Sequence, residues 1–309
     1  MKQRTIKKSI HCAGIGLHSG RKVELLLQPA AEDTGIVFCL QGENGVKLFS
    51  PSPNAVAFDG PAAALTHNGS AVATVEHLLA AIRGLEIDNI RISVQGGEVP
   101  IMDGSAASFV FLLRSAGLET QSRPRRALML KRPFAMERDG QIIKASPYAG
   151  IHLDYTLDHA HPMIGLQSMC VDITPEIFID KLARARTFEF MSDVENMQHQ
   201  GFALGGSLYN SVFLDDYKAL NPDGLRFKDE FVRHRMLDFL GDMALLDLPV
   251  FGRFEIHCSG HSLNKSFFQA LHDNRDIYLE ETVLSDKVLD QTRTLPGDVR
   301  EAAGCAASF

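Results

Sequence analysis

The chain has 309 residues, of which 45% are hydrophobic and 22% are charged, and its formal net charge is −7. This composition excludes a largely disordered chain, and the acidic balance argues against broad nucleic-acid binding, which needs a basic face. A chain of this length is expected to form two domains, because one domain typically has about 150 residues.

The first part of the chain combines short strands with two helices. Short apolar or alternating segments between turn residues are typical of strands, and longer segments between a capping residue and a glycine are typical of helices. Thr74 is the expected N-cap of the first helix, and Gly84 is its expected stop. The predicted elements are strands at 23–27, 35–40 and 89–95 and helices at 74–83 and 106–116.

The second part follows a polar segment, 119–126, that is predicted to be a linker. Its strands and helices show no regular β-α-β rhythm, which favours an α+β fold over a doubly wound parallel sheet. The expected domains are 1–122 and 123–292, followed by a tail at 293–309. The predicted elements are a hairpin at 139–140, strands at 151–157 and 253–258, and helices at 174–183, 230–246 and 264–273.

The cysteines and the N-terminus bear on the cellular compartment. The 5 cysteines are an odd number without a Cys-x-x-Cys pair, which predicts neither a disulfide framework nor a cysteine-only zinc site. The N-terminal segment lacks the apolar core of a signal peptide, and no run of about 18 apolar residues occurs. The sequence therefore predicts a cytoplasmic protein without a membrane-spanning helix.

The predicted helix at 230–246 carries His234, Asp238 and Asp242 at intervals of four residues. Successive members drift by only about 40° around a helix, so all three share one face. A histidine and an aspartate at this spacing can hold one metal ion from a rigid helix. The alternative is a solvent-exposed face that forms salt bridges with neighbouring arginines.

Two further segments carry candidate chemistry. Glu76 and His77 open the predicted helix at 74–83, where a histidine can complete a metal site and a carboxylate can act as a base. His261 follows a strand in Ser259-Gly260-His261, and Asp242 lies one helical turn beyond Asp238, from where its carboxylate can reach a histidine near the metal. The alternatives are a helix-terminal pair and an isolated loop histidine.

Taken together, six segments resemble one family, the UDP-3-O-acyl-N-acetylglucosamine deacetylases, which are the zinc amidases of lipid A biosynthesis. The segments span residues 14–264 in the family's order, and as a set they are specific. They are GIGLHSG (14–20), TVEHLLAA (74–81), EVPIMDGSAASF (98–109), ARARTFEFM (183–191), LNPDGLRFKDEFVRHRMLDFLGD (220–242) and SGHSLN (259–264).

The resemblance implies two domains, each a β-sheet with helices, whose helices pack between the sheets around an interdomain cleft. His77, His234 and Asp238 would hold one zinc ion, although iron also suits such a site. The remaining catalytic roles would fall to Glu76 as general base, to a charged His261 steadied by Asp242, and to Thr187 as a donor to the oxyanion. The implied substrate contacts are Leu17, His18, Phe188, Arg235 and Gly260.

The resemblance also implies the reaction, which is hydrolysis of the N-acetyl group of UDP-3-O-(3-hydroxyacyl)-N-acetylglucosamine by a monomer. Its acyl chain would lie against the irregular segment 191–215. The sequence departs from the family pattern at Arg235, Glu189, Cys258 and His159, which concern substrate binding rather than the metal. The alternatives are a zinc amidohydrolase for another acylated amino sugar and a non-catalytic metal-stabilised binding protein.

Overall fold

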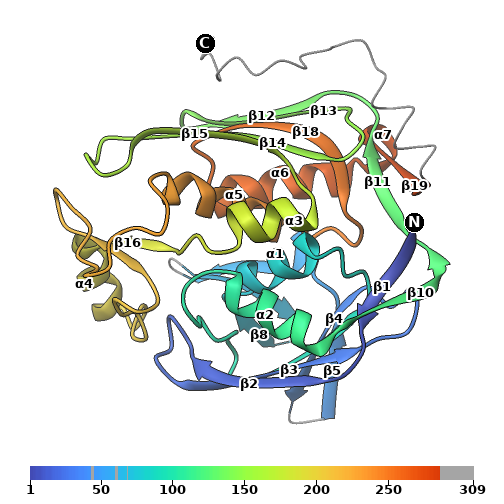
Figure 1. Ribbon diagram of the computed structural model, residues 1–309, viewed down its shortest axis with the longest axis horizontal. Helices are drawn as coiled ribbons and strands as arrows, with labels where there is room; N and C mark the ends of the chain where they lie inside the picture. The colour runs from blue at the N-terminus through green and yellow to red at the C-terminus, as the bar shows by residue number, and fades with distance from the viewer. Residues whose placement is uncertain (43–44, 60–61, 68, 286–309) are drawn as a thin grey trace.

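The computed structural model describes residues 1–309 except 43–44, 60–61, 68 and 286–309. Two β-sheets form the outer layers, and the main helices lie between them (Figure 1). This arrangement confirms the predicted α+β class. The predicted tail at 293–309 lies outside the described residues.

The first sheet is built from the N-terminal part of the chain and has the order β2-β3-β9-β4-β5. Alternate residues of its central strands are buried, as in Val23, Leu25 and Leu27 of β3, because one face packs against helices and the other faces solvent. The strands are β2 (Ile10–Ile15), β3 (Lys22–Pro29), β4 (Ile36–Gly42), β5 (Gly45–Phe49) and β9 (Ile90–Gln95).

The second sheet has seven strands, with the path β12-β13-β18-β11-β19 and with β14 and β15 joined through β18. Leu153 and Tyr155 of β14 are buried toward the helices, whereas Asp154 between them faces outward. The strands are β11 (Arg126–Leu130), β12 (Phe134–Arg138), β13 (Gln141–Ser146), β14 (Ile151–His159), β15 (Gly165–Asp172), β18 (Val250–His257) and β19 (Leu279–Val283).

The central layer is formed by helices from both halves of the chain (Figure 1). Helix α1 packs directly on α5, and α5 packs on α6. Their apolar faces belong to one continuous core that includes Leu78, Leu237 and Phe268. The helices are α1 (Glu76–Gly84), α2 (Ala107–Ala116), α5 (Glu230–Met243) and α6 (His261–Asp273).

Smaller elements complete the fold. A parallel pair, β16 and β17, and helix α4 form a lobe at the left of Figure 1. The remaining elements are β1 (Lys2–Ile6), η1 (Pro53–Ala55), β6 (Val56–Asp59), β7 (Ala62–His67), β8 (Ser70–Ala73), β10 (Leu118–Pro124), α3 (Pro175–Ile177), η2 (Phe178–Leu182), β16 (Phe188–Phe190), α4 (Met191–His199), β17 (Val212–Leu214) and α7 (Arg275–Tyr278).

Three expectations about local structure need correction. The expected linker 119–126 is largely strand β10, which pairs with β1. Thr74 does not cap α1, because its backbone is left-handed (φ 56°) and its hydroxyl donates to Glu98. The last predicted helix begins at His261 rather than at residue 264.

No helix in the part of the chain that the structure describes combines enough length with enough apolar character to cross a membrane.

Candidate metal centre and active site

The candidate site begins at the N-terminal end of α1, where the sequence places Glu76 and His77 side by side. A β-branched residue in the left-handed region is a strained outlier. Here that residue is Thr74, which is 4% exposed and hydrogen-bonded to Glu98 over 2.9 Å. The chain therefore turns sharply into the helix, and His77 points into the central layer.

Helix α5 supplies the other half of the site. The sequence predicted that His234, Asp238 and Asp242 share one face of this helix. The prediction is confirmed, because all three residues are buried. The alternative of a solvent-exposed salt-bridge face is therefore wrong. Burial of such groups is costly unless they are paired or bind a metal.

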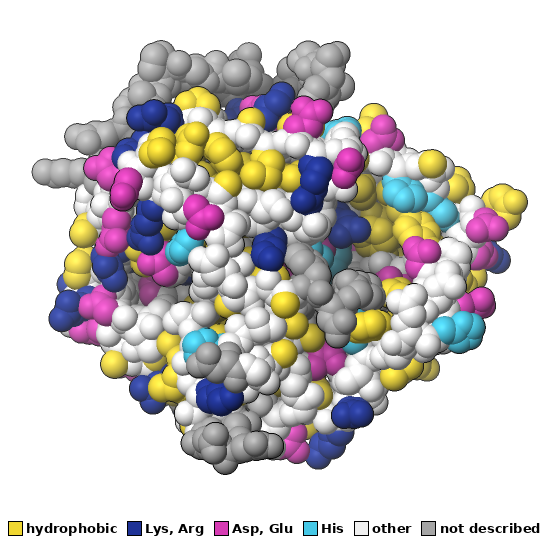
Figure 2. All heavy atoms as spheres, turned by 180° about the vertical axis from the view of Figure 1, so that it is seen from behind, with side chains coloured by type: hydrophobic (Ala, Val, Ile, Leu, Met, Phe, Trp, Pro, Cys, Tyr) yellow, Lys and Arg dark blue, Asp and Glu magenta, His cyan; other side chains and the backbone are white. Residues whose placement is uncertain are grey.

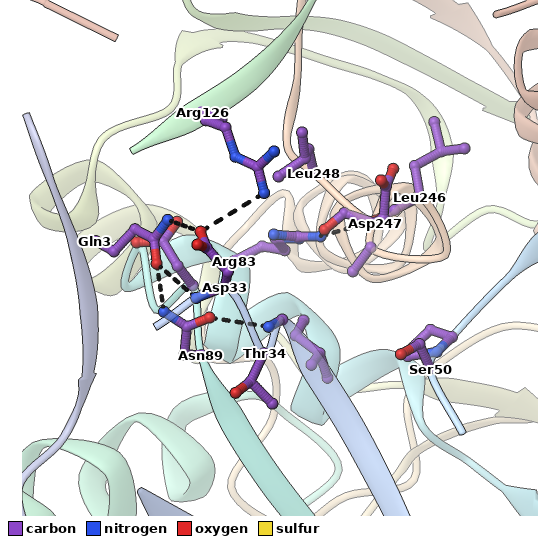
Figure 3. Close-up of a pocket in the computed structure, with 15 residues that line it drawn as sticks. Gln3, Asp33, Thr34, Ser50, Arg83, Asn89, Arg126, Leu246, Asp247 and Leu248 are labelled. Atoms are coloured by element: carbon purple, nitrogen blue, oxygen red, sulfur yellow. Dashed lines mark hydrogen bonds and ion pairs between the residues drawn. The ribbon is translucent and has the colours of Figure 1, made fainter. Parts of the chain in front are cut away.

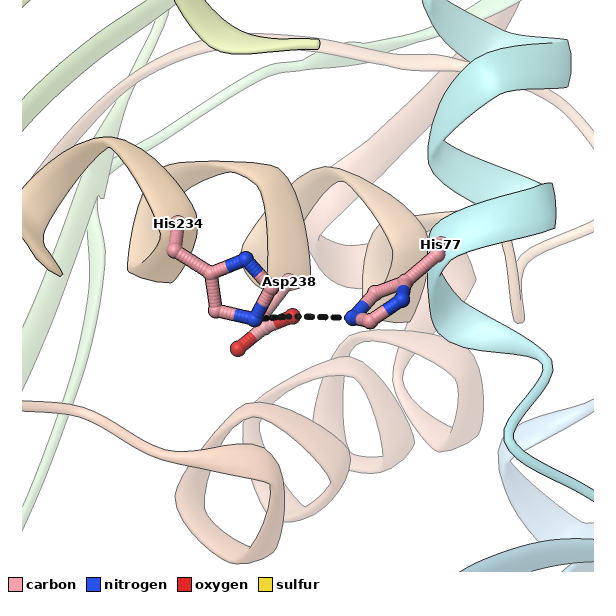
Figure 4. Close-up of side chains that lie close together, drawn as sticks. All are labelled: His77, His234 and Asp238. Carbon is pink, nitrogen blue, oxygen red and sulfur yellow. Dashed lines mark ion pairs between the residues drawn. The ribbon is translucent and has the colours of Figure 1, made fainter. Parts of the chain in front are cut away.

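His77, His234 and Asp238 converge on one point although α1 and α5 are far apart in the sequence (Figure 4). The Nε2 atoms of His234 and His77 lie 3.3 Å and 3.7 Å from Asp238 Oδ1. One potential ligand atom from each residue lies within 4.8 Å of the others. Two imidazoles and a carboxylate at this separation form a donor set suited to one divalent cation.

The hydrogen bonds around the cluster leave these donors available. His234 Nδ1 lies 3.1 Å from the carbonyl oxygen of Ala185, which makes Nδ1 the protonated nitrogen and frees Nε2. Asp238 Oδ1 and His77 Nδ1 are buried without a hydrogen-bond partner. Because buried polar atoms normally have partners, an unpaired carboxylate oxygen beside two imidazoles fits a cation site.

Burial also sets the charge of the two imidazoles. It lowers the pKa of His77 to about 3, and repulsion from His234 acts in the same direction. Burial likewise lowers the pKa of His234 to about 3. Both rings are therefore neutral near pH 7, which is the form that binds metals.

Glu76 lies beside this cluster, where its charge interacts with those of His261, Asp238 and Asp242. Burial, reinforced by Asp238, raises the pKa of Glu76 to about 7 although His261 opposes the shift. Glu76, Asp242 and His261 line a small cavity of about 20 Å³. A carboxyl group with a pKa near neutrality is suited to proton transfer.

His261 is held by a carboxylate, as its position after a strand and the spacing of Asp242 led us to expect. Its Nδ1 lies 2.8 Å from Asp242 Oδ2, which also accepts a hydrogen bond from Asn264 Nδ2 over 2.8 Å. Burial alone would lower the pKa of His261, but Asp242 and Asp238 raise it to about 10. The imidazole is therefore charged at neutral pH, and the alternative of an isolated loop histidine is wrong.

Phe188 and Arg235, both expected to contact substrate, lie together beside the cluster. The Arg235 guanidinium lies 4.9 Å from the centre of the Phe188 ring, and Arg235 Nη1 lies 3.7 Å from Asp238 Oδ2. Burial raises the pKa of the neighbouring Glu189 to about 7, although Arg235 lowers it. Arg235 therefore lies close to an aromatic ring and to two carboxyl groups at the edge of the site.

Leu17 and His18 lie in a loop that contacts the lobe around α4. The carbonyl oxygens of Leu17 and His18 accept hydrogen bonds from Gly205 and Leu204. The backbone N–H of His18 donates to Glu98, which is 3% exposed. Glu98 therefore joins this loop to the start of α1, a connection that sequence analysis missed because a single glutamate gives no periodic signal.

The other expected site residues have defined backbone positions. Thr187 donates its N–H to the carbonyl of Gly104, and Gly260 forms the extended N-cap of α6. His159 stacks on Phe190 with ring centres 5.1 Å apart, and the Cys258 thiol accepts a hydrogen bond from the N–H of Asp158. The roles of Thr187 and Gly260 in the site stay predictions.

The segment 191–215 is more regular than expected, because α4 and β17 occupy much of it. Val194, Val212 and Phe213 are buried, whereas Leu204 is exposed. The reverse face of the molecule is hollowed between the projecting lobe and the body, with histidine, cationic and hydrophobic side chains around the hollow (Figure 2). An apolar passage along this segment stays a prediction.

A separate cavity of about 150 Å³ lies near the segment that follows α5 (Figure 3). Its polar side chains bind one another, as in the 2.7 Å hydrogen bond from Gln3 Nε2 to Asp33 Oδ1. No residue of the His77, His234 and Asp238 cluster lines it. The chemistry is therefore concentrated at the cluster rather than in this cavity.

The fold and the cluster define an α+β protein with a candidate mononuclear metal site made of two histidines and one aspartate. A family profile of UDP-3-O-acyl N-acetylglycosamine deacetylases matches residues 3–273. The chain belongs to this family, as the sequence motifs predicted.

Three relatives illustrate the similarity, and each is named UDP-3-O-acyl-N-acetylglucosamine deacetylase. The protein of Oleidesulfovibrio alaskensis is 55% identical to this chain, in an alignment that covers 93% of this chain and 94% of that protein. The protein of Lawsonia intracellularis is 48% identical, in an alignment that covers 90% of this chain and 91% of that protein. The protein of Haemophilus influenzae is 42% identical, in an alignment that covers 97% of this chain and 99% of that protein.

Proposed function

We propose that this protein is a zinc-dependent deacetylase in lipid A biosynthesis. It would hydrolyse the N-acetyl group of UDP-3-O-(3-hydroxyacyl)-N-acetylglucosamine and release acetate. The observation that carries the proposal is the convergence of His77, His234 and Asp238 from two helices, beside Glu76 and beside a charged histidine held by Asp242. Relatives at 42% to 55% identity bear the corresponding name.

The donor set fits the proposed metal. His77 and His234 are neutral and buried, and Asp238 presents an oxygen that lacks a hydrogen-bond partner. These three residues would hold zinc, although iron also suits a His₂Asp site, where availability decides. When bound, such an ion acts as a Lewis acid toward the amide carbonyl and makes water more acidic.

The remaining steps fall to side chains of the chain itself. An amide is a poor electrophile and an amine is a poor leaving group, so the reaction needs a base for water and an acid for nitrogen. Glu76 would take the proton of the attacking water. His261, held by Asp242, would stabilise the developing negative charge or protonate the leaving amine, and Thr187 would donate a hydrogen bond to the oxyanion.

The proposal extends to substrate binding and to the organisation of the chain. Leu17, His18, Phe188, Arg235 and Gly260 would contact the substrate. The acyl chain would lie along 191–215. The two predicted domains would meet around the site, which agrees with α1 and α5 arising from different halves of the chain. The monomeric state and the cytoplasmic location stay predictions of this proposal.

The test is acetate release from UDP-3-O-(3-hydroxymyristoyl)-N-acetylglucosamine by protein that is metal-loaded, chelator-treated, or chelator-treated and then given zinc. We expect turnover in the first and third samples and its loss in the second. Parallel assays with iron would identify the preferred metal.

Two outcomes would contradict the proposal. Turnover of an acylated amino sugar without a nucleotide, together with poor turnover of the UDP substrate, would favour the alternative substrate class suggested by Cys258 and Glu189. Tight binding of zinc and of the UDP substrate without any acetate would identify a non-catalytic binding protein.

A further inference from the structure

The outer face of the seven-stranded sheet carries a nucleophile, a base and a carboxylate in contact. Cys170 and Asp172 lie on β15, and His152 lies directly opposite Asp172 on the antiparallel strand β14. Cys170 is exposed, whereas only 14% of the His152 side chain is exposed. All three point away from the helical layer, since Leu153, the residue after His152 on β14, is buried toward it.

The hydrogen bonds fix the tautomer of His152. Its Nδ1 lies 2.9 Å from Asp172 Oδ1, and its Nε2 lies 3.3 Å from Cys170 Sγ. A carboxylate only accepts hydrogen bonds, so Nδ1 carries the proton and Nε2 presents its lone pair to the thiol. Tyr148 donates its hydroxyl to the same Asp172 oxygen over 2.7 Å, and its ring packs on the imidazole.

This order of groups is that of an activated nucleophile, in which a base contacts the nucleophile and a third group orients the base. A neighbouring imidazole increases the thiolate fraction of a cysteine. The His152 side chain is largely buried, so its imidazole loses little conformational freedom when it acts as a base. The cluster therefore has the components that a reactive thiol needs.

The charges on neighbouring strands affect the same thiol. Asp154 is the cross-strand partner of Cys170, and its negative charge disfavours a thiolate at Cys170. Arg253 Nη2 lies 3.6 Å from Asp154 Oδ2 and offsets the charge of this carboxylate. Arg253 also pairs with Glu255, which lies opposite Lys144 on β13. Arg253 and Lys144 therefore place two positive charges beside the two carboxylates on this face of the sheet.

The other described thiols lack this exposure. Cys12, Cys39 and Cys258 are each partly buried. Burial raises the pKa of the Cys12 thiol, which disfavours its reactive form. The Cys258 thiol is engaged by the backbone of Asp158. Cys258 therefore serves as the internal reference thiol in the same chain.

We propose that Cys170 is a nucleophilic thiol and a site of S-thiolation by low-molecular-weight disulfides. The Cys170 sulfur attacks one sulfur of the disulfide, a new S–S bond forms, and the original S–S bond breaks. His152 Nε2 takes the thiol proton and returns it to the departing sulfur, so no further oxidant or reductant is consumed. The reaction is independent of the proposed deacetylase activity, because the cluster lies on the opposite face of the sheet from the helices.

The experiment uses the full chain and the neutral probe 2,2′-dithiodipyridine. Release of pyridine-2-thione is followed by absorbance, and peptide mass spectrometry assigns the label to each cysteine. Rates are compared at a pH well below the ordinary thiol pKa of about 8.5. The variants are His152→Gln, Asp172→Asn and Cys170→Ser, and Thr156→Val on the same face of β14 is the matched control.

We expect Cys170 to react about tenfold or more faster than Cys258 at this pH, because His152 Nε2 lies 3.3 Å from the Cys170 sulfur and a positioned base increases the fraction of the reactive thiolate. His152→Gln should remove this advantage, Asp172→Asn should reduce it, and Thr156→Val should preserve it. Equal rates for Cys170 in the wild type and in a folded His152→Gln protein would overturn the proposal. If His152→Gln fails to fold, the rate in Asp172→Asn decides in the same way.

Discussion

At the scale of single residues, the candidate site depends on buried polar atoms whose partners are incomplete. Asp238 Oδ1 and His77 Nδ1 have no hydrogen-bond partner, and Glu76 is held in an environment that raises its pKa to about 7. Each of these conditions costs stability in a protein without a ligand. We infer that the cost is offset when metal and substrate are bound.

Glu76→Gln is expected to lower kcat by about 10²- to 10⁴-fold, the usual contribution of a positioned general base. The amide has almost the same shape but cannot accept the water proton. The bound metal, measured by elemental analysis, should not change, because Glu76 is not among the proposed ligands. Glu119→Gln, at an exposed position of β10, is the control. Near-normal turnover by Glu76→Gln would show that another group is the base.

A second prediction at this scale concerns Asp103 and pH. Burial opposes ionisation of Asp103, but Arg226 Nη1 at 2.8 Å and the hydroxyls of Ser105 and Ser108 lower its pKa below the ordinary value. A carboxyl with a lowered folded-state pKa stabilises the fold above the unfolded-state pKa of about 4 and loses this effect as the pH falls through the folded-state value.

Asp103→Asn should therefore reduce the free energy of unfolding by about 1–2 kcal/mol near pH 7. The difference from wild type should shrink as the pH falls below about 4, because the wild-type carboxyl then becomes neutral as well. Urea unfolding curves at both pH values measure this. A difference that stays constant with pH would mean that shape, rather than charge, accounts for the effect.

At the scale of elements, the contact between α1 and α5 determines whether the ligands meet. Gly241 of α5 faces the backbone of Glu76, and a Cβ atom at this position would lie 2.3 Å from the Glu76 carbonyl oxygen. Backbone atoms cannot move aside as a flexible side chain can. The glycine therefore sets the distance between the two helices.

Gly241→Ala should separate α1 from α5 and reduce the free energy of unfolding by about 1–3 kcal/mol, although alanine favours helix formation. The affinity for zinc should also fall, because His77 moves away from His234 and Asp238. Gly150→Ala is the control, since its Cβ would meet Tyr148 only at an ordinary 3.6 Å. Unchanged stability and zinc affinity in Gly241→Ala would contradict this account of the helix contact.

The elements also show where local sequence signals were insufficient. Thr74 has the residue type and position of an N-cap, yet its hydroxyl donates a hydrogen bond to Glu98, 24 residues away. The polar segment 119–126 resembles a linker, but β1 lies beside it and pairs with it. In both cases a partner distant in the sequence prevailed over the local preference, as propensities alone cannot anticipate.

At the scale of the whole molecule, the proposed metal would join the two halves of the chain. His77 comes from α1, whereas His234 and Asp238 come from α5. His234 follows His77 in the sequence by 157 residues. A ligand that binds only the folded state stabilises it, by about 2.7 kcal/mol at a free concentration 100 times Kd. Metal binding and global stability are therefore expected to be coupled.

Addition of zinc to chelator-treated protein should raise Tm by several degrees, as expected for stabilisation of about 2–3 kcal/mol in a chain of this size. His77→Gln should abolish most of this shift although the two ligands of α5 remain. His11→Gln, at an exposed histidine of β2, should preserve it. Differential scanning calorimetry provides the measurement. An equal shift in His77→Gln and wild type would place the zinc elsewhere.

The sequence by itself determined the α+β class, the existence of the main helices, and the shared face of His234, Asp238 and Asp242. These properties follow from hydrophobic periodicity, from turn residues and from the 3.6-residue period of a helix, all of which are local. Its ordered motifs also predicted the family, which the profile match over 3–273 confirmed.

Only the tertiary structure decided which of these residues meet. The 3.7 Å approach of His77 to Asp238, the connection made by Glu98, and the cluster of Cys170, His152 and Asp172 all join residues that are distant in the sequence or on different strands. Such contacts depend on how helices and strands pack, and packing is set by the shape and burial of the whole core rather than by any local pattern.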